Sequence, residues 1–141
     1  MLRAFFAKKT ISDISYLTLR ISGMRLTEEF EIAASGREDG SAVISRYEII
    51  YGGGAEERRL SAAAGLPLPD VISMLNECRV LEWDGFFGPH PRTVTDGEMF
   101  VMEASVNGGR RITASGSQNF PKGFYDLRRR LGEAAGSGQT G

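Results

Sequence analysis

Residues 99–115, MFVMEASVNGGRRITAS, contain the pattern that decides the fold. Apolar side chains occupy every second position from Phe100 to Val106, which is the period of a strand with one buried face. Asn107 and two glycines follow, and this combination favours a tight turn because hairpin turns need positive φ angles. Residues 110–115 then continue as a second strand. The stretch therefore predicts an antiparallel hairpin.

The part of the chain that precedes this hairpin contains more segments of the same period. Residues 14–22, 25–34 and 42–51 alternate apolar and polar side chains and are separated by glycine-containing turns. Glu28 is the one break in the apolar face of the second segment. Residues 56–63 are rich in charge, which suits a strand at the edge of a sheet. Together with the hairpin, these segments predict a sheet of about five to six strands.

Two other segments have the period of a helix. Through residues 69–79, apolar side chains recur at i, i+3, i+4 and i+7. Pro121 marks the predicted start of a second helix, whose apolar stripe runs from Phe124 to Leu131. The element order is thus three or four strands, a helix, two strands and a helix. This order predicts an α+β fold, an antiparallel sheet with two helices on one face.

Length and composition predict one domain without a cofactor. The chain has 141 residues, and we expect an N-terminal extension (1–12), a single α+β domain (13–134) and a flexible tail (135–141).

Seventeen basic and 18 acidic side chains give a net charge of -1, which provides no overall attraction for nucleic acid or an anionic membrane. One cysteine, and no apolar run long enough for a signal peptide or membrane span, predict a cytoplasmic protein. No complete nucleotide-binding or metal-binding motif is present.

The stretch WDGFFGPHPRT, residues 83–93, holds the only tryptophan and the only histidine. Trp83 follows two apolar residues at the end of the first predicted helix, so we expect it to close the core rather than to bind a ligand. The polar run 115–121 precedes the second helix, and we favour helix capping over anion binding for it. If these two loops meet, the candidate ligand-binding residues are Trp83, Asp84, Phe86, His90, Arg92, Ser117 and Asn119.

Three functions remain open at this point. By elimination the first is a non-enzymatic module that binds an unknown protein or small ligand. The second is a small hydrolase in which His90 acts as general base, Asp84 orients it, and Ser117 or Asn119 supplies a nucleophile or an oxyanion donor. The third is an anion or nucleic-acid binder, which we disfavour because no aromatic side chains interleave the arginines and one of them is expected to pair with Asp126. Its arginines are Arg110, Arg111, Arg128, Arg129 and Arg130.

Two motifs also carry a resemblance. LEWDGFFGPHPR and ITASGSQNFPKGF resemble a set of small bacterial proteins and domains of unknown function, which pair a W-D-G-F turn with an S-G-S-x-x-F-P segment. The similarity covers roughly residues 13 to 132. It implies a bacterial origin and a single compact domain, and it implies no activity and no catalytic residue.

Overall fold

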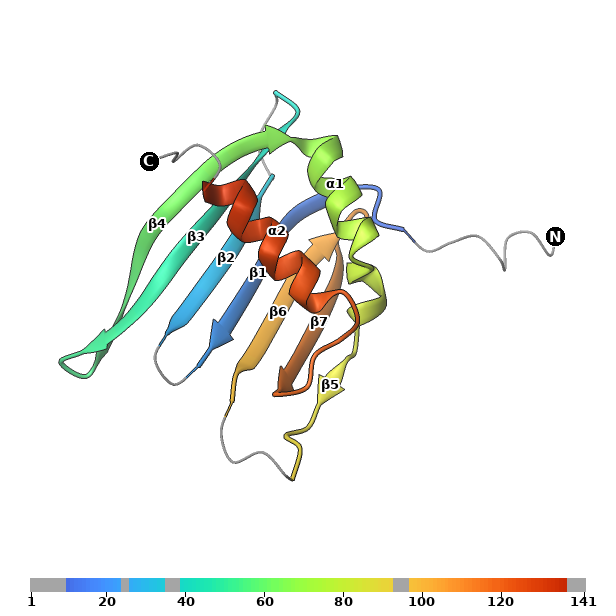
Figure 1. Cartoon of the computed structure of the whole chain (residues 1–141). Helices are drawn as coiled ribbons and strands as arrows, with labels where there is room; N and C mark the ends of the chain where they lie inside the picture. Colours follow the sequence, from blue (N-terminus) through green and yellow to red (C-terminus); the bar gives the residue numbers. More distant parts are fainter. Residues whose placement is uncertain (1–9, 24–25, 35–38, 93–96, 137–141) are drawn as a thin grey trace.

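The computed structural model describes residues 10–23, 26–34, 39–92 and 97–136. Their main feature is a single sheet with both helices on one of its faces (Figure 1). The strands are β1 (Ile14–Ser22), β2 (Thr27–Ala33), β3 (Ser41–Gly52), β4 (Ala55–Pro67), β5 (Phe87–Gly88), β6 (Met99–Val106) and β7 (Arg110–Ser117). The helices are α1 (Leu68–Glu77) and α2 (Phe124–Gly136), and a short 3-10 helix spans Val80–Trp83. The α+β prediction is confirmed.

The sheet differs from the prediction in strand number and in direction. It has seven strands in the order β4-β3-β2-β1-β6-β7-β5, and β5 pairs with β7 in parallel. The prediction of five to six strands, all antiparallel, is therefore wrong. β5 has only two residues, too few to show an alternating pattern. It joins the sheet because main-chain bonds from Gly85 to Thr113 and from Ser115 to Phe86 attach the corner to β7.

The core lies between the sheet and the two helices. Trp83 is 1% exposed, and its indole Nε1 donates a hydrogen bond of 2.9 Å to the carbonyl oxygen of Lys122. Its ring packs against Phe100 and Phe124. Phe86 is partly buried against the same cluster. The prediction that Trp83 closes the core is confirmed.

The core extends slightly beyond the predicted domain boundaries. Ile11 is 2% exposed and Ala135 is fully buried, so both belong to the packed unit. Residues 1–9 and 137–141, which hold most of the predicted extension and tail, lie outside the described residues. Within the described part of the chain, no helix is long and apolar enough to cross a membrane.

Close backbone packing brings the two candidate loops together. A Cβ atom added at Gly116 would lie 2.1 Å from the carbonyl oxygen of Asn119, and one added at Gly88 would lie 2.6 Å from the same oxygen. Any side chain at these two positions would force the backbones apart. The glycines of the W-D-G-F-F-G and S-G-S stretches therefore allow β5 and the segment after β7 to pack directly.

Candidate functional site

A groove follows β7 on the face of the sheet opposite the helices, which we call the uncovered face. Its floor is formed by three small hydroxyl residues at alternate positions, Thr113, Ser115 and Ser117. In the register of the sheet, Ser115 pairs with Phe87 of β5 on one side and with Val101 of β6 on the other. Small residues in the middle strand and large ones on both neighbours make a trough.

The walls of this groove are unusually apolar for a solvent-facing surface. Phe87 is 73% exposed, Val101 60% and Met99 52%. A hollow of about 220 Å³ lies at the Met99 end and another of about 360 Å³ lies towards Thr113. Phe87, Val101 and Ser115 line both hollows, so the two hollows are continuous parts of one groove.

His90 stands at one end of the groove. Its Nδ1 atom lies 2.8 Å from the hydroxyl oxygen of Ser117. Asn119 comes from the other loop, and its side-chain amide donates a hydrogen bond of 3.3 Å to the carbonyl oxygen of Pro89. The 83–92 part of the first loop and the 115–121 loop therefore do meet, and His90, Ser117 and Asn119 lie together.

Asp84 lies at the opposite end. Its carboxylate accepts a hydrogen bond from the main-chain nitrogen of Thr113 and pairs with Arg110, at 3.2 and 3.3 Å. Thr113 precedes Ser117 by four strand residues, a distance of about 13 Å. The geometry thus does not support the role predicted for Asp84, that of orienting His90.

The other three candidate residues have different surroundings. Trp83 packs in the core, whereas Phe86 is partly buried against the core and also lines the hollow towards Thr113. Arg92 is exposed and follows His90 by two residues. It has no ion pair with any residue that the structure describes.

The prediction of helix capping by the 115–121 run is wrong. Ser117 contacts His90, Gln118 accepts a hydrogen bond from the main chain of Glu98, and Asn119 bonds to Pro89. These polar side chains hold the two loops together instead. The helix itself begins later than predicted, at Phe124.

The five arginines proposed as an anion site are matched by carboxylates. On β7, Arg110 pairs with Asp84 and Arg111 with Glu103. On α2 the partners are Glu28 and Glu98 for Arg128, Asp126 and Glu133 for Arg129, and Glu77 and Asp126 for Arg130. The helix covers one face of the sheet, whereas Arg111 lies on the other. The arginines therefore do not form a single basic patch.

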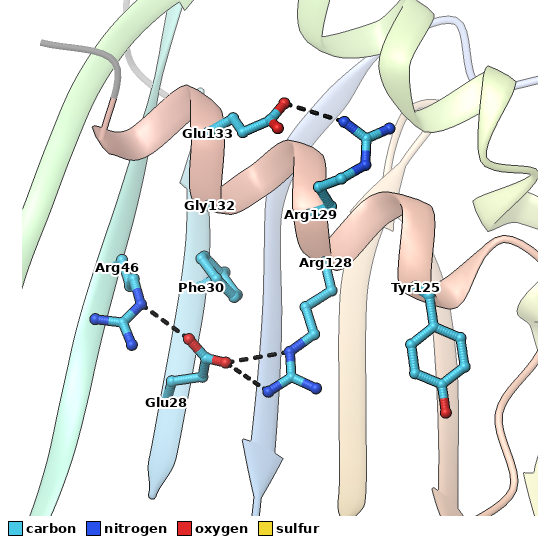
Figure 2. A pocket seen from close by; sticks show the side chains of 8 residues that line it. All are labelled: Glu28, Phe30, Arg46, Tyr125, Arg128, Arg129, Gly132 and Glu133. Atoms are coloured by element: carbon cyan, nitrogen blue, oxygen red, sulfur yellow. Dashed lines mark hydrogen bonds and ion pairs between the residues drawn. The ribbon is translucent and has the colours of Figure 1, made fainter.

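A further hollow, of about 440 Å³, lies beside α2 on the covered face (Figure 2). Figure 2 shows Glu28 between Arg46 and Arg128. Each guanidinium has a nitrogen 2.8 Å from an oxygen of the Glu28 carboxylate. Glu28 is only 7% exposed. Two arginines on one buried carboxylate explain the break in the apolar face of β2 and give the hollow a structural role.

Glu103, beside the groove, is held as a carboxylate. A hydrogen bond from the Tyr16 hydroxyl, followed by the contact with Arg111, lowers the pKa of this side chain. Its charge is thus matched locally. In the part of the chain that the structure describes, no group of three His, Cys, Asp or Glu side chains lies close enough to hold a metal ion.

The sequence did not identify the walls of the groove as site residues. One signal for them was present: Met99 and Val101 are large apolar residues on the predicted polar face of residues 99–106. Phe87 had no such signal, because its strand is too short for a pattern. The chain matches no protein-family model and no curated protein.

Proposed function

We propose that this protein is a non-enzymatic binding module that takes apolar side chains of a protein partner into the groove along β7. One observation carries the proposal: Phe87, Met99 and Val101 are each more than half exposed and line the same groove. Contiguous exposed apolar surface is rare on soluble domains and marks interaction sites.

A protein partner fits the groove better than a small ligand does. Sites for small molecules bury most of the ligand surface. Both helices cover the other face of the sheet (Figure 1), and Phe87 in the wall of the groove is 73% exposed, so the described part of the chain leaves the groove open to solvent. A macromolecule brings its own surface to cover the apolar walls, which a small ligand does not.

Selection of peptides from a displayed random library tests the proposal. The wild-type protein should enrich peptides with apolar side chains, and the double variant Phe87→Ser, Val101→Ser should bind them at least about ten-fold more weakly. Leu60→Ser is the matched control, because Leu60 is 56% exposed but lies on β4, outside the groove. Equal binding by the double variant, or no enrichment, would refute the proposal.

A second candidate function is hydrolysis, favoured by the 2.8 Å approach of His90 to Ser117. In this candidate Ser117 is the nucleophile and His90 its general base. A fluorophosphonate probe should then label Ser117 in the wild type and not in His90→Ala. Absence of label on Ser117 in the wild-type protein would exclude this candidate.

A further inference from the structure

We infer that the ligand of the groove is an extended peptide segment with two apolar side chains at positions i and i+2 and an acidic residue next to them, at the His90–Arg92 end. This inference rests on the proposed function and names the chemistry of the partner. Three features carry it: the spacing of the two hollows, the width of the groove and the charges at its ends.

The spacing of the hollows matches an extended chain. One hollow lies between the Ser117–Met99 and Ser115–Val101 rows of the sheet. The other lies between the Ser115–Val101 and Thr113–Glu103 rows, so the two hollows are one row apart. Adjacent outward-facing positions on a strand are two residues apart, about 6.6 Å. Side chains i and i+2 of an extended peptide have the same separation and point to the same side. Two such side chains therefore fit the two hollows.

The width of the groove favours an extended segment over a helix. β5 and β6 flank β7, so their backbones are two strand spacings apart, about 9.6 Å. Phe87 and Val101 project from these strands and narrow the opening further. An α-helix with its side chains is about 10–12 Å across and would rest on top of the walls. The side chains of an extended peptide enter one at a time.

Charge at the two ends of the groove differs. At the Thr113 end, Glu103 and Asp84 are each matched by an arginine. At the other end His90 lines the Met99 hollow, and the exposed Arg92, which follows His90 by two residues, makes no ion pair with any residue that the structure describes. Because Arg92 follows His90 by only two residues along the chain, its long side chain can reach an acidic residue of the peptide placed beyond the side chain in the Met99 hollow. The charge pattern thus favours an acidic group at this end and gives the ligand a direction in the groove.

Titration of labelled peptides by fluorescence anisotropy tests the inference with the full chain. The probes are GLTLDG and GDLTLG, which present the two leucines and the aspartate in both chain directions. Comparators are GLLTDG, with adjacent leucines, GLTTTLDG, with leucines four apart, and GLTLNG and GNLTLG, without the charge. One of the first two should bind at least about five-fold more tightly than either leucine-spacing comparator. The Arg92→Ala variant should bind that peptide about three- to five-fold more weakly than the wild type does, and its affinity for the neutral analogue should be unchanged.

Two controls separate this inference from the proposed function. Arg79→Ala removes an arginine outside the groove and should leave all affinities unchanged. In one outcome, library-selected ligands require Phe87 and Val101 while every spacing comparator binds as well as the two probes. That result would refute the inference of an extended ligand and would leave the proposed binding function of the groove supported. If Arg92→Ala lowers the affinity for the charged peptide and for its neutral analogue by the same factor, the inference of an acidic residue in the ligand is refuted. If no ligand depends on Phe87 and Val101, the proposed function itself fails.

Discussion

Truncation of Trp83 should be among the most damaging substitutions in this protein. Trp83→Ala removes a side chain that is 1% exposed, and losses of this kind cost about 3–5 kcal/mol in unfolding free energy. It also leaves the Lys122 carbonyl oxygen without its 2.9 Å donor, a further loss of about 1 kcal/mol. The expected total is about 4–6 kcal/mol. Domains of this size have unfolding free energies of about 5–15 kcal/mol, so the variant should lose most of its stability if the wild type is near the lower end of this range.

The measurement is urea unfolding followed by far-ultraviolet circular dichroism, because removal of the only tryptophan also removes the fluorescence signal. Trp83→Phe keeps most of the ring volume but not the N–H group, and should cost about 1–2 kcal/mol. Phe87→Ala is the surface control and should stay within about 0.5 kcal/mol of wild type. A loss below about 1 kcal/mol for Trp83→Ala would refute the place of Trp83 in the core.

Other consequences of the structure can be measured in the same way. Glu28→Ala leaves Arg46 and Arg128 without their shared carboxylate and should cost about 2–3 kcal/mol, whereas the exposed Glu133→Ala should cost less than about 0.5 kcal/mol; equal costs would contradict the buried network. Burial, and then the nearby Asp126 charge, raise the pKa of Cys78 to about 11. The unfolded thiol titrates near about 8.5, so the contribution of this group to stability is full below that pH and is lost as the pH rises towards 11. The difference in unfolding free energy between wild type and Cys78→Ala should therefore fall over this range, and a constant difference would contradict the shift. The matched arginines predict that the protein passes through a heparin column at low salt, and retention that salt removes would restore the nucleic-acid hypothesis.

The sequence predicted those strands whose two faces differ in character. β1 and β6 have the predicted bounds, residues 14–22 and 99–106, because one face of each strand packs against the helices and the other does not. The edge strand β4 was predicted too short. Its second half is rich in alanine and has no clear alternation.

The site was predicted only in part, because it depends on contacts between distant segments. The sequence singled out His90, Ser117 and Asn119 as candidates but left open whether their two loops meet, and the structure shows that they do. Phe87 was missed because its exposure depends on the parallel pairing of β5 with β7, which two residues do not indicate. The same limit applies to Asp84, whose partners Thr113 and Arg110 lie on a strand that follows it in the chain.

The most direct test of the central claim is a map of amide chemical-shift changes in isotopically labelled protein titrated with the tighter-binding probe peptide. We predict saturable shifts at Phe87, Val101, Ser115 and Ser117, with no comparable change along α2. Saturable shifts centred on the hollow beside α2 that leave β5, β6 and β7 unchanged would contradict the account.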